Sequence, residues 1–186
     1  MSRLQLADLT GREKLFSPDD VLTSKTDLRG VITYANDIFA EIAGFSPAEL
    51  YGAPHSLIRH PEMPRAVFAL MWSHIEQGRE FFGYVVNRSK GGDHYWVLAH
   101  IVPDVDPETR EIVGYHSTRR CPSRAGVAEA SKLYSAIRDA ERRRPRDQQV
   151  EAGLEAAAGL LKAAGVTYEQ WIFSQINRHE RLLEEG

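Results

Sequence analysis

Three strand-like segments that follow one another between Glu80 and Arg120 constrain the fold of this chain more than any other feature. Each is rich in β-branched and aromatic residues, which favour a pleated sheet. We expect the strands at residues 80–88, 93–103 and 111–120. A Gly-Gly pair and one short polar turn separate them, and connections this short can join only antiparallel neighbours. The segment is therefore predicted to form an antiparallel meander.

The middle strand of this meander is apolar on both faces. Alternation places Tyr95, Val97, Ala99 and Ile101 on one face and Trp96, Leu98, His100 and Val102 on the other. Helices packed on one side of a sheet cover only one of these faces. We therefore expect the other face to contact the terminal segments of the chain or a second subunit.

Two more strands and two short helices are predicted before the meander. Residues 21–25 and 31–34 are β-rich and are separated by the turn-forming Asp27-Leu28-Arg29-Gly30. Asn36 can then cap a short helix that ends at Gly44. The sequence Ser46-Pro47-Ala48-Glu49 is a capping box with proline at the first helical position, and it predicts a second short helix.

The stretch from residue 53 to residue 64 contains three prolines and two histidines, and we expect it to be an irregular connection. Pro64 can begin a longer helix that ends near Gly78. One side of it carries Val67, Phe68, Met71, Trp72 and Ile75. The prediction up to this point is a mixed α/β domain with an opening hairpin, short helices and an antiparallel meander.

The composition changes after Cys121, where Ala, Glu, Arg and Leu take over with helical spacing. We expect helices at residues 125–143, 150–164 and 168–183, with Asp147 capping the second and Thr167 the third. The expected organisation is an N-terminal cap (1–20), an α+β domain (21–121) and a helical C-terminal extension (122–186).

Charge and cysteine content exclude several classes of function. The net charge of −3 gives no overall attraction for nucleic acid or an anionic membrane. The chain has one cysteine, so it can form neither an internal disulfide nor a cysteine zinc site. The sequence contains no apolar run long enough to predict membrane insertion. The single cysteine fits a reducing compartment, and we expect a cytoplasmic protein. We assign no metal site, because His55 and His60 lie in a loop with Glu62 as the only acidic neighbour.

Three segments of the chain resemble one family of sensory domains. The first runs from Thr26 to Asn36 (TDLRGVITYAN) and is followed by AGFS at residues 43–46. The second is the connection GAPHSLIRHPEMP at residues 52–64, and the third is VNRSKGGDHYWV at residues 86–97. Together with the order of the elements, these segments resemble the PAS domain of bacterial aerotaxis receptors.

That resemblance implies an α+β PAS fold with a five-stranded antiparallel sheet and short helices on one face. It also implies a redox or oxygen sensor that holds FAD noncovalently in a cleft and acts in signal transduction, as in aerotaxis. The positions that match the family's flavin-associated residues are Asn36, His55, Arg59, His60, Asn87 and, as Glu in place of the usual Asp, Glu62. Phe81 stands where the family has a tryptophan; it can stack on a flavin ring but cannot donate an indole hydrogen bond.

Residue chemistry supports part of this assignment independently. Arg59 and His60 precede the N-terminus of the longer helix, and together they suit a pyrophosphate. Asn36 and Asn87 can each offer a donor and an acceptor to the ring edge, although a helix cap and a strand contact are their plainer roles. Phe68, Trp72, Phe81 and Tyr95 either wall the cleft or are simply core residues.

Two alternatives stay open besides the flavin sensor. One is a haem-binding PAS gas sensor, for which His74 and His116 are candidate ligands. The other is a cofactor-free PAS dimerisation module. A light-driven thiol adduct is not expected, because the connection before the longer helix holds no cysteine. We expect no enzymatic activity, a homodimer, and a signalling partner such as a kinase or chemoreceptor.

Overall fold

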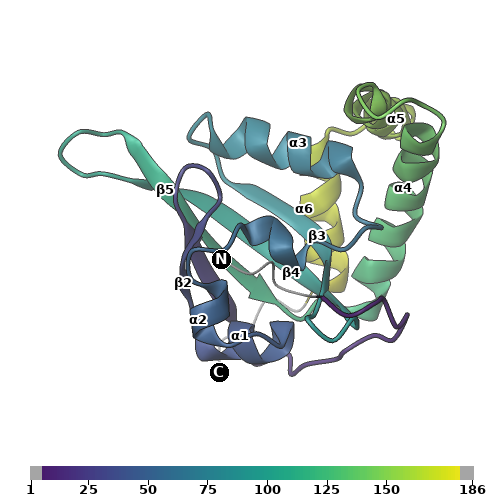
Figure 1. Ribbon diagram of the computed structural model, residues 1–186. Coiled ribbons are helices and arrows are strands. Elements are labelled where there is room, and N and C mark those ends of the chain that lie inside the picture. Colours follow the sequence, from purple (N-terminus) through teal and green to yellow (C-terminus); the bar gives the residue numbers. More distant parts are fainter. Residues whose placement is uncertain (1–5, 181–186) are drawn as a thin grey trace.

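The computed structural model describes residues 6–180 of the 186-residue chain. Its centre is a five-stranded antiparallel sheet with the strand order β2-β1-β5-β4-β3 (Figure 1). The strands are β1 (Leu22–Thr26), β2 (Ile32–Ala35), β3 (Phe81–Arg88), β4 (His94–Val105) and β5 (Ile112–Arg120). The antiparallel meander that the short turns predicted is confirmed, and so is the hairpin ahead of it.

Short helices cover one face of this sheet, as predicted. They are α1 (Asp37–Ala43), α2 (Pro47–Leu50), the 3-10 helix η1 (His55–Ile58) and α3 (Arg65–Ile75). Asn36 caps α1 through the Phe39 N–H, and Ser46 and Glu49 form the expected capping box of α2. The connection between residues 53 and 64 contains η1, which the sequence prediction treated as irregular.

Strand register decides which side chains face α3. Cross-strand partners lie on the same face, so Val85 and Val97 share a face with Asn87 and Tyr95. Ala99 lies opposite Arg119, and Ile101 lies opposite Ser117. We call this the inner face of the sheet. The intervening residues, including Trp96, Leu98 and His100, point to the outer face.

The C-terminal extension forms three helices. They are α4 (Arg124–Arg142), α5 (Gln149–Ala163) and α6 (Tyr168–His179). Thr167 caps α6 as predicted, but Asp147 does not cap α5, whose N-cap position is Gln148 without a side-chain bond. The last helix was expected to reach Leu183, and residues 181–183 lie outside the described part of the chain.

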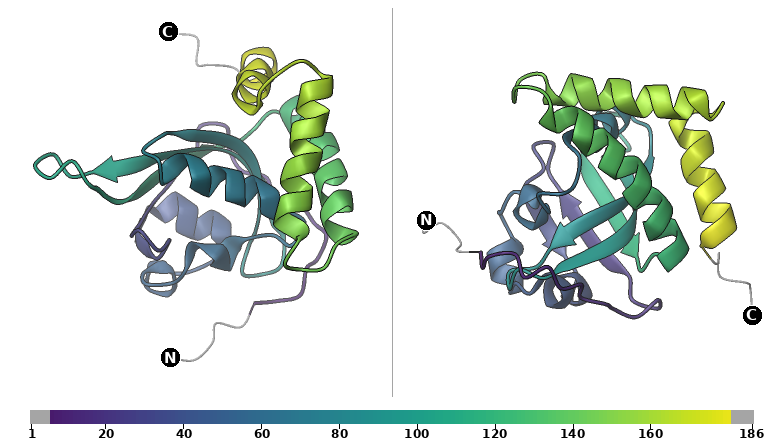
Figure 2. Two further views of the ribbon diagram at one scale, coloured as in Figure 1. Left: turned by 90° about the horizontal axis from the view of Figure 1, so that it is seen from above. Right: turned by 90° about the vertical axis from the view of Figure 1, so that its right-hand side faces the viewer.

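This extension packs beside β3, one of the two edge strands of the sheet (Figure 2). The hydroxyl of Tyr134 on α4 donates to the carbonyl of Tyr84 at 2.7 Å, and that of Tyr168 on α6 donates to the carbonyl of Phe82 at 2.9 Å. These bonds use backbone acceptors that an exposed edge strand would offer to another chain. The extension thus protects the edge of the sheet.

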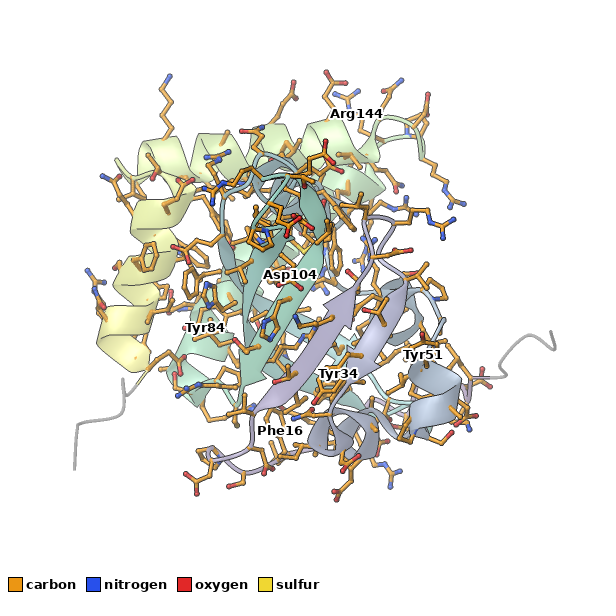
Figure 3. The ribbon with its side chains drawn as sticks, turned by 90° about the vertical axis from the view of Figure 1, so that its left-hand side faces the viewer. Phe16, Tyr34, Tyr51, Tyr84, Asp104 and Arg144 are labelled. Carbon is orange, nitrogen blue, oxygen red and sulfur yellow. The ribbon has the colours of Figure 1, made fainter. Side chains whose placement is uncertain are left out.

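The extension also covers part of the outer face. The Trp96 ring stacks on Tyr134 with centroids 6.4 Å apart, and Phe173 of α6 packs on Phe82 at 5.2 Å. Figure 3 looks onto this face and shows Tyr84 beside the extension and Tyr34 on β2, away from it. The expectation that a terminal segment would contact the second apolar face is confirmed for the part of the sheet near β3.

The N-terminal segment runs beside the start of β4. The Lys14 N–H donates to the His94 carbonyl at 2.7 Å, and the Phe16 ring packs edge-on against Tyr95. Within residues 6–180, no helix combines the length and the apolar character needed to cross a bilayer.

Candidate functional site

A cavity of about 190 Å³ lies between α3, η1 and the inner face of the sheet. Its apolar walls come from two layers of the fold. Phe68, Met71, Trp72 and Ile75 project from α3, and Val85, Ala99 and Ile101 project from the sheet. The long apolar side chains on one side of α3 therefore wall a cavity, as the spacing of those residues allowed.

Two buried polar side chains line the cavity at separate places. Asn87 is 3% exposed and Ser117 is 6% exposed. Asn87 is paired with Tyr95 on β4, whereas Ser117 is paired with Ile101, six residues further along that strand. Among the residues that the structure describes, Asn87 Nδ2 and Ser117 Oγ have no hydrogen-bond partner. Buried polar atoms are nearly always paired, so each orphaned group indicates a place for a polar atom of a ligand.

Arg119 lines the cavity beside Ser117, two residues away on the same face of β5, and is 4% exposed. Its Nη2 donates to His55 Nε2 at 2.7 Å, and Nη1 and Nη2 donate to Ser24 Oγ at 3.1 Å. Within residues 6–180, no carboxylate pairs with this guanidinium. Burial lowers the pKa of Arg119 to about 10, so it still carries its charge at neutral pH. A buried charge without a counter-ion is costly to a folded protein.

His55 shares the environment of Arg119. Its ring stacks on the Phe39 ring with centroids 6.0 Å apart. The Arg119 guanidinium also lies over the Phe39 ring, 5.2 Å from its centroid. Burial, together with the nearby charge of Arg119, lowers the pKa of His55 to about 3. His55 is therefore neutral and accepts a hydrogen bond from the guanidinium.

The pKa of His55 predicts a pH-dependent loss of stability. Between pH 6.5, the ordinary value, and about 3, the unfolded chain binds a proton that folded His55 does not. Stability therefore falls as the pH falls through this window. Urea unfolding at several pH values should show wild type losing up to about 1.4 kcal/mol more per pH unit than His55→Gln below pH 6. Equal slopes for the two proteins would contradict this assignment.

The open side of the cavity carries two further arginines. Arg59 is half-buried, with its guanidinium 4.0 Å above the Phe68 ring, and Arg29 is exposed. Burial and the charge of Arg65 lower the pKa of Arg59. Arg29 pairs with Asp27 at 3.3 Å. The cavity therefore has a buried end at Arg119 and an opening at which Arg59 supplies the unbalanced positive charge.

The N-terminus of α3 is not the anion site that the sequence suggested. Glu141 of α4 accepts hydrogen bonds from the backbone N–H groups of Arg65 at 3.2 Å and Ala66 at 2.8 Å. Its side chain is 6% exposed, and Gly153 of α5 approaches so closely that a Cβ there would lie 2.7 Å from Ala66 Cβ. A carboxylate from the extension therefore fills the position assigned to a pyrophosphate.

Five of the ten predicted site residues line the cavity, and five do not. His55, Arg59, Phe68, Trp72 and Asn87 line it. Asn36 does not line the cavity, and both ends of its side-chain amide bond to backbone groups instead. Its Oδ1 accepts from Thr23 N and Phe39 N, and its Nδ2 donates to Val21 O.

The other four predicted site residues that do not line the cavity contact other parts of the chain. They are His60, Glu62, Phe81 and Tyr95. His60 accepts from the Glu62 N–H, and Glu62 pairs with Arg138 of the extension at 3.2 Å. Phe81 stacks on Tyr168 with centroids 5.5 Å apart, beyond the end of the cavity. Tyr95 is fully buried under Phe16, and its hydroxyl has no partner within the described chain.

Sequence reasoning missed Ser24, Ser117 and Arg119. Every second residue of β5 points to the same face of the sheet. The inner face therefore receives Tyr115, Ser117 and Arg119, which are spaced two residues apart. Applying that alternation to the last strand could have found them. The haem-ligand candidates do not line the cavity, since both nitrogens of His74 face Leu70 O and Glu169 Oε1, and His116 lies on the outer face.

Comparisons with known proteins agree with this architecture. The family described as PAS fold matches residues 32–119. The aerotaxis receptor of Escherichia coli (strain K12) is 42% identical over 129 residues, which are 69% of this chain and 25% of the receptor. A nitrogen fixation regulatory protein of Klebsiella pneumoniae is 33% identical over 88 residues, 47% of this chain and 18% of that protein. The chain thus spans a quarter or less of these relatives.

Solved structures of light-oxygen-voltage (LOV) domains show the same fold. The dark structure of the blue-light photoreceptor Aureochrome1 LOV aligns with a TM-score of 0.54 and 22% identity, covering 61% of this chain and 84% of that one. A light-oxygen-voltage domain studied with a flavin analogue aligns with a TM-score of 0.53 and 19% identity, covering 63% of this chain and 87% of that one.

Proposed function

This chain belongs to the PAS family, and on that basis we propose that it is a redox or oxygen sensor whose inner cavity holds a flavin, specifically FAD. The observation that carries the proposal is the buried end of the cavity. A charged guanidinium without a carboxylate partner in residues 6–180 lies there with the orphaned hydroxyl of Ser117, and the cavity has an aromatic wall. A flat ring with a polar edge fits both features.

Two similarities support the choice of ligand. The relative with 42% identity carries the name aerotaxis receptor, and one structural neighbour is a domain studied with a flavin analogue. Asn87, His55 and Arg59, which match the flavin-associated positions of the aerotaxis receptors, all line the cavity.

The proposed role is sensory and not catalytic. The pKa values of Arg119, about 10, and His55, about 3, both lie far from pH 7. Neither side chain is therefore poised to exchange a proton with a substrate at neutral pH. They can hold a ligand in one orientation and one charge environment.

Signal output would begin at α3. A bound flavin supplies a ring whose charge and hydrogen bonding change on reduction. On its inner side α3 walls the cavity with Phe68 and Trp72, and at its N-terminus Glu141 of α4 holds two backbone N–H groups. A shift of α3 would therefore change the packing of the extension, provided that the two redox states favour different positions of α3.

We further propose a cytoplasmic protein that forms a homodimer and passes its state to a kinase or chemoreceptor. The half-exposed outer face of β1, β4 and β5 supports the dimer, because the extension covers that face only near β3. A single cysteine fits a reducing compartment.

The visible spectrum of the purified protein tests the proposal. We expect a yellow protein with flavin absorption and about one flavin per chain, released on denaturation and identified as FAD by chromatography. A haem absorption band would favour the gas-sensor alternative, and a colourless protein that takes up no added flavin would favour the cofactor-free module. Either result would contradict the flavin sensor.

A further inference from the structure

The hydrogen bonds of Arg119 leave part of its guanidinium free to bind a ligand. A guanidinium has five N–H donors. The contacts to Ser24 Oγ and His55 Nε2 use one hydrogen of Nη1 and both of Nη2. The Nε–H and the second Nη1–H have no partner within residues 6–180. Both existing partners are neutral, so neither offsets the charge.

The surroundings of Arg119 provide room and further polar groups. Directly opposite Arg119 on β4 stands Ala99, whose small side chain leaves the space above it open to the cavity. Ser117, two residues earlier on the same face of β5, contributes an orphaned hydroxyl. Spare N–H and O–H groups of two neighbouring β5 side chains thus lie at this buried end of the cavity.

We propose, on the basis of the function proposed above, that Arg119 together with Ser117 binds the carbonyl-bearing edge of the flavin ring. Arg119 is then the residue that decides the affinity for the ring itself. A planar guanidinium matches the edge of a planar ring because both present their hydrogen-bonding atoms in one plane.

The phosphate groups of a flavin nucleotide suit the other end of the cavity better. A phosphate is strongly hydrated, and bringing it to the closed end would require its desolvation against a single cation. Arg59 and Arg29 stand at the open side, where a phosphate can keep water and meet the charge of Arg59, while Arg29 already pairs with Asp27 at 3.3 Å. The closed end therefore suits the ring, and the open side suits a hydrated phosphate.

Three ligands separate these roles. Riboflavin carries the ring without phosphate, FMN adds one phosphate, and FAD carries the pyrophosphate. We would measure the Kd of each for ligand-free full-length protein, by flavin fluorescence, in wild type and Arg119→Met. Loss of a charge-assisted hydrogen bond should weaken all three by a similar factor of about 10 to 100.

Two matched variants complete the experiment. Arg59→Met should weaken FMN and FAD more than riboflavin. Arg120→Met changes the neighbouring exposed arginine on the opposite face and should leave all three affinities within about twofold of wild type. The ligand-free melting temperature of Arg119→Met should equal or exceed that of wild type, because replacing an unpaired buried charge by an apolar side chain removes a cost.

Each other outcome overturns a specific statement. If Arg119→Met weakens FMN and FAD but leaves riboflavin unchanged, Arg119 binds phosphate and the inference is wrong. If wild type binds flavin and Arg119→Met binds it equally well, the inference fails while the proposed function stands. Failure of wild type to bind any of the three defeats the proposed function. If Arg119→Met unfolds, Arg119→Gln replaces it in the same comparison, with the same expected loss for all three ligands.

Discussion

Replacing Ala99 with leucine is expected to expel the flavin without unfolding the protein. Ala99 is 1% exposed, lines the cavity and faces Arg119 across the β4–β5 ladder. A branched side chain there would occupy the space into which the ring edge must reach. Overlap of this kind costs about 1–3 kcal/mol, so flavin affinity should fall roughly 10- to 100-fold.

Ligand-free stability separates this effect from misfolding. The leucine enters a cavity, so the melting temperature of ligand-free protein should stay level or increase. Thr118→Leu is the matched control, because Thr118 is on the neighbouring strand but faces the outer side of the sheet. Flavin titrations of both variants are the measurement. Unchanged affinity in Ala99→Leu would show that the flavin lies somewhere other than this cavity.

Glu141→Ala is expected to cause the largest loss of stability among the substitutions considered. The change leaves the N–H groups of Arg65 and Ala66 without their acceptor in a place enclosed by α4 and α5. Two orphaned buried donors cost about 2–4 kcal/mol together. Because α3 also walls the cavity, flavin affinity should decrease as well.

Thermal unfolding with and without flavin would measure both effects. For a chain of this size we expect the melting temperature to fall by roughly 5–15 °C. Glu155→Ala, on the exposed side of α5, removes the same side chain without touching α3 and should change the melting temperature by less than about 2 °C. A Glu141→Ala protein as stable as this control would mean that the extension does not hold the cavity helix.

Local sequence signals predicted most of the sheet and its helices. Asn36, the Ser46–Glu49 capping box and Thr167 each mark a helix start through bonds within three residues. Short turns leave no choice but antiparallel pairing, which determined the order of β3, β4 and β5. Signals of this kind depend only on neighbours in the chain, so they can be recognised without knowledge of the fold.

The candidate site was less accessible to sequence reasoning, because its decisive contacts join distant residues. Glu141 reaches Ala66 across 75 positions, and Arg119 reaches His55 across 64. No local pattern distinguishes these side chains from exposed charges. Asn36 illustrates the converse, since a helix-capping residue uses its amide locally and has none to offer a ligand.

A crystal structure of the purified, coloured protein tests the central claim most directly. We expect electron density for a flavin ring between α3 and the inner face of the sheet, with its carbonyl edge at Arg119 and Ser117. Density that shows this space filled by water or by the protein's own side chains, with the chromophore bound elsewhere, would contradict the account.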